Sequence, residues 1–145
     1  LMITGAVCTT FINELPQGLH NLQAGGNVYK VALYDNSATL NASTTVYSTT
    51  NEITGTGYTA GGEIVTSVTP VTSGTTSLLD FADAAFAAVT ISNVGGALIY
   101  NSTNGNRAVV VLEFNSVVAA TAKTLNIIFP GATVSTAILR IANNG

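Results

Sequence analysis

The chain has few charged residues, a single cysteine and no tryptophan. Lys, Arg, Asp and Glu make up 8% of its 145 residues, where about 25% is usual for a soluble domain. A lone cysteine, Cys8, excludes an internal disulfide. No apolar run approaches the ~18 residues of a membrane-spanning helix, and the N-terminus lacks the basic flank of a signal peptide. We therefore expect no membrane segment and no disulfide framework.

The scarcity of charge also limits the kinds of partner. The four basic residues are scattered along the chain, at Lys30, Arg107, Lys123 and Arg140. Nucleic-acid-binding surfaces need clustered Lys and Arg to displace phosphate counterions, so we expect no DNA or RNA partner. Interface cores are depleted of charged side chains because desolvating them is costly. The composition therefore fits a surface covered by protein partners, and it equally fits a secreted protein with a Thr- and Asn-rich exterior.

One segment, residues 7–22, has the pattern of a helix. Its apolar residues recur at helical spacing, at Val7, Phe11, Leu15, Leu19 and Leu22. Pro16 removes an amide donor and clashes with the preceding turn. We therefore expect either a short helix that ends near Leu15 or two pieces around a kink. Thr9 or Thr10 could cap its start.

From Val28 onward the pattern is that of β-strands. Short runs rich in Val, Ile, Leu and Thr recur about every ten residues. They are Val28–Tyr34, Glu63–Thr69, Ser77–Phe81, Val89–Ser92, Ala97–Tyr100, Ala108–Phe114, Leu125–Phe129 and Ala137–Ala142. Such spacing predicts a mainly β fold, an antiparallel β-sandwich or barrel-like domain with one short N-terminal helix. A chain of this length can bury a sufficient core by itself, so we expect residues 1–145 to form a single domain.

Three connecting segments have patterns of their own. Residues 101–106 predict a hairpin turn, because Asn104-Gly105 tolerates positive φ. Residues 82–88 are ambiguous, since their alanines would also suit a helical turn. Residues 35–62 are long for a loop, and long loops are usually functional or mobile.

No residues have the spacing of a catalytic or metal site. His20 is the only histidine, and neither an HExxH nor a GxSxG motif surrounds it. We expect His20 at a helix end, in contact with the backbone or a neighbouring subunit. Asp80 and Asp83 lack the EF-hand pattern and are expected to be exposed loop carboxylates. The sequence therefore predicts no enzyme, no cofactor and no bound metal.

The glycine-rich segment Gly55–Gly62 is similar to a phosphate-binding loop only at first sight. It lacks the Gly-Lys-Ser/Thr ending of such loops. Glycines spaced in this way more often permit a tight turn or a bulge. We expect such a turn to present Tyr58, and tyrosine is a common anchor at protein interfaces.

Several motifs, taken in order, resemble those of a family of small structural proteins in tailed bacteriophages. They are Met2-Ile3-Thr4-Gly5, Phe11-x-x-Glu14-Leu15 with Gly18-x-His20, Val31-Ala32-Leu33-Tyr34, Gly55–Gly62, Asp80-Phe81-Ala82-Asp83 and Ala97-Leu98-Ile99-Tyr100-Asn101-Ser102. The resemblance covers most of the chain. Pro16 is a departure, since similar proteins carry a helix former there.

This resemblance implies a virion component that is assembled in the host cytoplasm. Its first implication is a capsid decoration or cement protein, an oligomer that binds the major capsid protein and neighbouring copies of itself and stabilises the head. The alternatives are a tail-associated protein of the tube, tip or fibre and a glycan-binding module for host attachment. The expected contact residues are Met2, Ile3, Thr4 and Val7, where residues 1–7 could extend as an N-terminal arm, together with Tyr47 and Tyr58.

Overall fold

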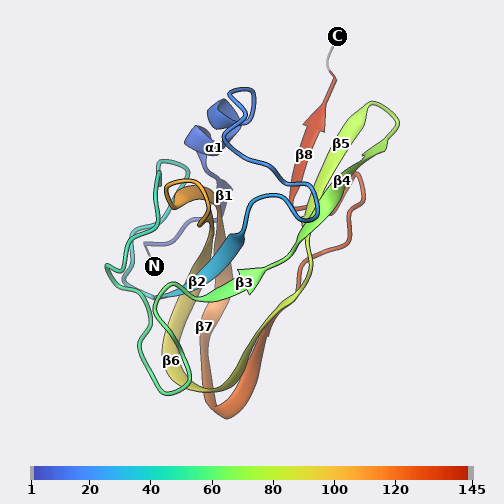
Figure 1. Cartoon of the computed structure of the whole chain (residues 1–145). Coiled ribbons are helices and arrows are strands. Elements are labelled where there is room, and N and C mark those ends of the chain that lie inside the picture. The colour runs from blue at the N-terminus through green and yellow to red at the C-terminus, as the bar shows by residue number, and fades with distance from the viewer. Residues whose placement is uncertain (1, 144–145) are drawn as a thin grey trace.

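Two antiparallel sheets and one short helix make up the fold of residues 2–143, which the computed structural model describes. The elements are β1 (Ala6–Val7), α1 (Thr9–Glu14), β2 (Tyr29–Asp35), β3 (Glu63–Val65), β4 (Ser67–Ser73), β5 (Thr76–Phe81), β6 (Ala84–Asn101), β7 (Arg107–Ile127) and β8 (Leu139–Ala142). A five-stranded sheet has the order β1-β7-β6-β2-β3, and a three-stranded sheet has the order β4-β5-β8 (Figure 1). The predicted mainly β, sandwich-like fold with a short N-terminal helix is confirmed.

The helix ends where the sequence predicts. α1 stops at Glu14, with Leu15 as its C-cap, directly before Pro16. Its N-cap is Cys8, which makes no side-chain capping hydrogen bond, so the prediction of a threonine cap is wrong. Phe11 is fully buried in the core. Burial of this face, rather than capping, therefore holds the helix in place.

Two long strands replace four of the predicted short ones. Val89–Ser92 and Ala97–Tyr100 both belong to β6, and Ala108–Phe114 and most of Leu125–Phe129 belong to β7. The ambiguous segment 82–88 is mainly strand, since β6 begins at Ala84. A helical turn there is therefore excluded.

The predicted hairpin turn between these strands is confirmed. Asn101 pairs with Arg107, and positive φ occurs at Gly105 and Asn106. The left-handed residues are thus displaced by one position from the expected Asn-Gly pair.

Irregular pairing bends the long β6–β7 hairpin. The register shifts at several points between Phe86 and Tyr100. Ala88, Asn93 and Ala122 have positive φ, which is uncommon for residues other than glycine. Bulges of this kind increase the local twist and bend the strand. As a result, the far part of the hairpin curves back toward β5 (Figure 1).

The predicted strand Glu63–Thr69 is in fact two strands in different sheets. β3 pairs with β2 in the larger sheet, whereas β4 pairs with β5 in the smaller one. The chain changes sheet at Thr66, whose carbonyl accepts a hydrogen bond from the N–H of Ala82. One apolar run therefore supplies an edge strand to both sheets.

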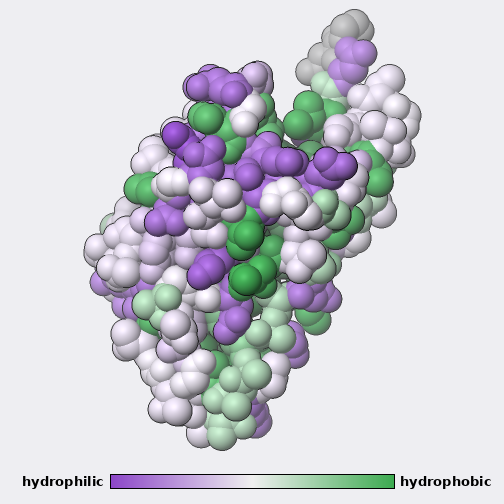
Figure 2. Space-filling model, in the orientation of Figure 1, coloured by the Kyte–Doolittle hydropathy of each residue, from purple (hydrophilic) through white to green (hydrophobic). Residues whose placement is uncertain are grey.

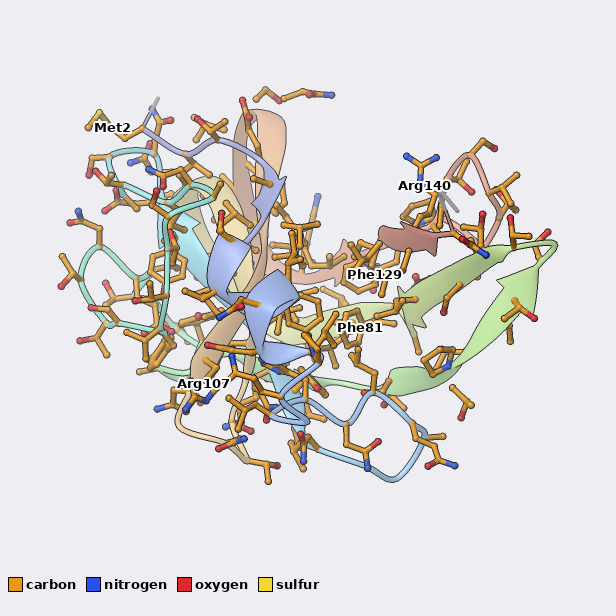
Figure 3. The ribbon with its side chains drawn as sticks, turned by 90° about the horizontal axis from the view of Figure 1, so that it is seen from above. Met2, Phe81, Arg107, Phe129 and Arg140 are labelled. Carbon is orange, nitrogen blue, oxygen red and sulfur yellow. The ribbon has the colours of Figure 1, made fainter. Side chains whose placement is uncertain are left out.

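Aromatic side chains join the two sheets into one hydrophobic core. The ring of Phe81 on β5 lies 5.5 Å from that of Tyr29 on β2 and 6.2 Å from that of Phe129. Figure 3 shows Phe81 and Phe129 between the sheets. These residues belong to a single buried cluster that also contains Phe11 and Phe86.

Replacing Gly62 with alanine is expected to destabilise the domain strongly. Gly62 has φ +76°, and a Cβ there would lie 1.8 Å from the carbonyl oxygen of Val31 on β2. Relief requires the backbone to move, so we expect the free energy of unfolding to fall by roughly 3 kcal/mol or more. Gly18→Ala is the matched control, because Gly18 has φ +72° but nothing within 4 Å. Urea unfolding of both variants checks this; equal losses would contradict a steric cause.

Candidate functional site

Of the expected N-terminal arm, residue 1 lies outside the described residues, and residues 3–7 lie against the rest of the molecule. Ile3 is 1% exposed and forms a bridge with Leu40, whose carbonyl also accepts the N–H of Thr4. Ala6 and Val7 form β1 and pair with β7. Met2 is exposed on the outside of the molecule (Figure 3). Of the four N-terminal contact residues, Met2 and Thr4 are thus the exposed ones, whereas Ile3 is core and Val7 packs against it.

The two expected tyrosine anchors make hydrogen bonds inside the chain. The hydroxyls of Tyr47 and Tyr58 donate to the carboxylate of Glu52 at 2.6 and 2.7 Å, and the N–H of Gly61 donates to it at 2.7 Å. Tyr47 also stacks on Tyr100 at 4.5 Å. Burial, followed by the hydrogen bond to Glu52, raises the pKa of Tyr47. Both tyrosines are half-buried, and their contacts hold the 36–62 loop on the sheet.

His20 was expected at a helix end, in contact with the backbone or a neighbouring subunit, but it lies beyond the end of α1 in a buried network of side chains. Its Nε2 is 2.6 Å from Oε2 of Glu14, and Nη1 of Arg107 donates to the other carboxylate oxygen at 3.0 Å. Its Nδ1 is 3.1 Å from Nδ2 of Asn101. Neither ring nitrogen meets a hydroxyl group, so the arrangement is not that of a Ser-His-acid site.

Asn101 is a structural residue that the sequence patterns did not single out. It is fully buried, and its amide donates to Asn27 at 2.9 Å. Its Oδ1 accepts the N–H groups of Thr103 and Asn104. The side chain therefore connects the hairpin turn to the segment that follows α1. The available signal is its position at the end of a strand before an Asn-Gly turn.

The carboxylates that could suggest a metal site are used as backbone caps. Asp80 accepts the N–H of Phe81, and Asp83 accepts the N–H of Phe129, both at 2.8 Å. Within residues 2–143, no group of three or more His, Cys, Asp or Glu side chains could hold a metal ion. The same part of the chain contains no helix long and apolar enough to cross a membrane.

Most of the charged side chains are engaged within the chain. Among the described Lys, Arg, Asp and Glu residues, only Lys30, Glu63 and Lys123 make no hydrogen bond or ion pair. Glu113, for example, accepts the N–H of Gly5. Few charged side chains in the described chain are therefore left without a partner of their own.

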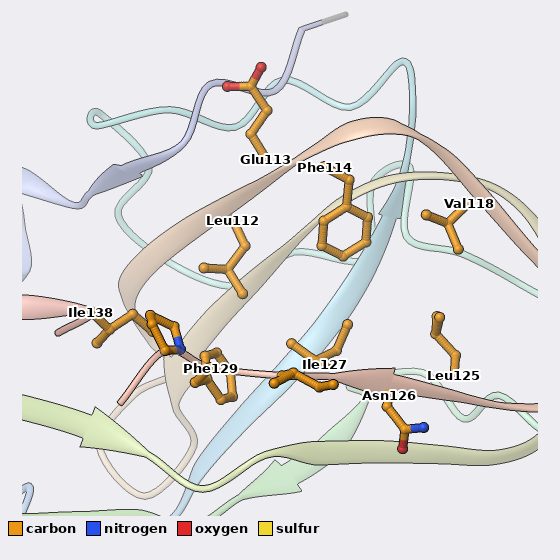
Figure 4. A pocket seen from close by; sticks show the side chains of 11 residues that line it. Leu112, Glu113, Phe114, Val118, Leu125, Asn126, Ile127, Phe129 and Ile138 are labelled. Carbon is orange, nitrogen blue, oxygen red and sulfur yellow. The ribbon is translucent and has the colours of Figure 1, made fainter. Parts of the chain in front are cut away.

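The bend of β7 creates an apolar groove of about 320 Å³, which we call the β7 groove. In Figure 4, side chains from the first half of β7 face side chains from its second half and from the segment that follows. The lining residues are Leu112, Glu113, Phe114, Val118, Leu125, Asn126, Ile127, Ile128, Phe129, Pro130 and Ile138. Its one ionisable lining residue, Glu113, turns its carboxylate away (Figure 4).

The β7 groove has a highly exposed apolar residue at its rim. Ile128 is 75% exposed, the largest exposure among the large hydrophobic residues of the described chain. Phe114 is half-buried, with its ring turned into the groove (Figure 4). The groove can therefore receive apolar side chains of a partner, but it offers no charged group for catalysis or anion binding.

A separate hollow of about 460 Å³ lies against the 39–51 loop and is polar. Its lining is Tyr34, Thr39, Leu40, Asn41, Ser43, Thr44, Thr45, Val46, Ser48, Thr50 and Asn51. These side chains offer neutral hydroxyl and amide groups, without a carboxylate or a cation. Tyr34 is buried, and its hydroxyl donates to the carbonyl of Ser48.

The fold and the groove define a β-sandwich-like domain that carries an apolar groove on its surface. Comparison with known proteins finds no matching family model, no matching curated protein and no matching solved structure. A function for the chain therefore rests on its own residues and geometry.

Proposed function

We propose that this chain is a structural subunit that docks on another protein through the β7 groove. The apolar groove itself, with Ile128 on its rim, is the observation that carries the proposal. Contiguous exposed apolar surface is typical of protein-interaction sites. The low content of charged residues supports it, because uncharged surface costs little to desolvate at an interface.

The assembly that fits best is the head of a tailed bacteriophage. The ordered motifs of the sequence favour a capsid decoration or cement protein, which binds the major capsid protein and neighbouring copies of itself. In that role the β7 groove receives apolar side chains from a capsid subunit. Contacts repeated over the lattice gain strength from multivalency even where each is weak.

Replacing Ile128 with lysine is expected to weaken binding to phage heads by at least about tenfold, because it places a charge on the groove rim. The measurement is co-sedimentation of the purified chain with heads that lack it. Ile64→Lys is the matched control: Ile64 is 62% exposed and lies on β3, outside the groove lining. Equal binding by the two variants would reject the groove as the docking site.

Cryo-electron microscopy of intact virions tests the place in the particle. Copies on the head lattice would support a decoration protein. Density confined to the tail would reject that role and support the tail-associated alternative.

A glycan-binding module is the second candidate, and the polar hollow of the 39–51 loop favours it. Sugars are often held by stacking on exposed aromatic rings. All ten Phe and Tyr residues of the chain lie within the described residues, and each is buried or half-buried, which counts against this candidate. A glycan array with the purified protein tests this candidate. Binding that is lost in Asn41→Ala and retained in Ile128→Lys would support it over the assembly role.

A further inference from the structure

The edges of the two sheets differ in how well they are protected from pairing with another strand. β1 and β3 contain only two and three residues. β4 carries Pro70, and its pairing with β5 shifts between Val68 and Val71. Short length, proline and irregular pairing all prevent edge strands from recruiting other chains. β8 contains no proline and pairs with β5 in an unbroken register.

The outer edge of β8 has identifiable free backbone groups. The N–H of Asn143 donates to the carbonyl of Thr75, so residue 143 faces β5. Backbone groups alternate between the two sides of an antiparallel strand. Leu139 and Ile141 therefore also face β5, and the N–H and C=O groups of Arg140 and Ala142 point away from it. β8 is the last strand in its sheet, so these groups have no neighbouring strand in the described chain.

A second apolar groove runs beside this edge, between α1 and β8, and we call it the β8 groove. It has a volume of about 370 Å³ and is lined by Ile12, Leu15, Pro16, Leu139, Arg140, Ile141 and Ala142. Ile12 is 54% exposed and Ile141 is 49% exposed. Figure 2 shows hydrophobic patches beside α1 and β8 at the top of the molecule. Free backbone groups and apolar side chains thus lie side by side.

We propose that β8 pairs antiparallel with β8 of a second copy of this chain, so that the two three-stranded sheets become continuous. The register follows from the outward groups. When Arg140 of each copy lies opposite Ala142 of the other, each such pair exchanges both backbone hydrogen bonds. Both outward residues of both strands are then paired, and the contact has the two-fold symmetry usual for homodimers.

The side chains support the same register. Shifting it to place Arg140 opposite Arg140 would bring like charges together, which is unfavourable across strands. In the proposed register, Ile141 instead lies opposite Ile141 of the second copy. Side chains alternate along a strand, so Leu139 and Ile141 lie on the same face of β8, the face that lines the core and the β8 groove. In the dimer, Ile141 of each copy can therefore cover the β8 groove of the other copy, beside Ile12.

The contact deepens the proposed function, on which its biological role rests, although it needs no capsid protein to form. The paired strands are short, and stable interfaces bury about 1,200 Å² or more. We therefore expect weak self-association in solution, with a Kd between about 10 µM and 1 mM. On a lattice, pairing between neighbouring copies would add to the avidity of head binding.

Analytical ultracentrifugation of the purified chain up to about 1 mM tests the pairing. Ile141→Lys is expected to raise the dimer Kd at least about tenfold, because it places a charge at the two-fold axis. Val71→Lys is the matched control: Val71 is also 49% exposed but lies on β4, the opposite edge of the same sheet. Ala142→Pro removes only an outward amide and leaves the β5 pairing intact, so it is also expected to raise the Kd.

A cysteine variant tests the register directly. Opposed residues of a non-hydrogen-bonded pair have Cα atoms about 4.5 Å apart, so Ile141→Cys is expected to form a disulfide-linked dimer on oxidation, and Val71→Cys is not. Cys8 is buried and does not compete. Far-UV circular dichroism verifies folding, and if Ile141→Lys fails to fold, Ala142→Pro and Ile141→Cys decide.

Three results would overturn the proposal: a wild-type chain that stays monomeric throughout, equal weakening by Val71→Lys, or no cross-link through Ile141→Cys. Ile128→Lys should leave self-association unchanged. The self-association proposal and the head-binding proposal can therefore be rejected independently of each other.

Discussion

Raising the pH above about 10 is expected to unfold this domain in one steep transition. All five tyrosines are buried or half-buried. Burial raises the pKa of each phenol above its ordinary value of 10.0, to about 12 for Tyr100 and further for the others. Hydrogen bonds to Glu52 raise the pKa of Tyr47 and Tyr58 in addition. The folded state therefore resists ionisation that the unfolded chain accepts.

The direction of the pH effect follows from proton linkage. A phenol whose pKa is raised by folding stays protonated in the native state while the same phenol ionises in the unfolded chain. Its stabilising contribution is complete below pH 10 and falls by about 1.4 kcal/mol per pH unit between pH 10 and the pKa of the folded state. Five tyrosines together lower the stability by roughly 7 kcal/mol per pH unit, against a total of about 5–15 kcal/mol for a typical domain. Cys8 adds to the loss from pH 9, since burial raises the pKa of its thiol to about 11.

The measurement is a pH titration that follows tyrosinate absorbance and far-UV circular dichroism in the same sample. The two signals are expected to change together, because the tyrosines ionise only as the sheets separate. The chain unfolded in guanidinium is the reference and should titrate near the ordinary pKa. Gradual ionisation near pH 10 with an unchanged dichroism spectrum would show that the tyrosines are accessible in the folded state.

The parts of the fold that could be predicted from the sequence are those set by the backbone preferences of single residues. Pro16 ends α1 because its ring and missing amide act within one turn. The hairpin turn of residues 101–106 is likewise a local preference. The long strands were missed for a related reason: bulges at Ala88, Asn93 and Ala122 break the alternation of side chains that identifies a strand. A bent strand therefore looks like two short ones in the sequence.

The candidate site depends on relations that no local pattern contains. Leu112 and Leu125 line the same groove only because β7 bends between them. The edge position of β8 depends on sheet order, which the sequence leaves open. Tyr47 and Tyr58 were predicted as interface anchors from their residue type and their place in the long 35–62 segment. Their hydroxyls instead share the carboxylate of Glu52, and no local pattern in the sequence brings Glu52 together with either tyrosine.

Replacing Glu52 with leucine is expected to lower the free energy of unfolding by about 3–5 kcal/mol. The carboxylate of Glu52 accepts hydrogen bonds from Tyr47, Tyr58 and the N–H of Gly61. A buried donor left without a partner costs about 1–3 kcal/mol, and leucine would leave all of these donors unpaired at once. Chemical denaturation by urea measures the loss.

Two controls separate the carboxylate from other sources of stability. Glu63→Leu makes the same chemical change at an exposed residue without a hydrogen bond, so we expect a change within about 0.5 kcal/mol. Tyr47→Phe removes one donor together with its need for an acceptor and keeps the stacking on Tyr100, so its cost should be about 1 kcal/mol. If Glu52→Leu cost no more than Tyr47→Phe, the stacked rings rather than the carboxylate would hold the 36–62 loop.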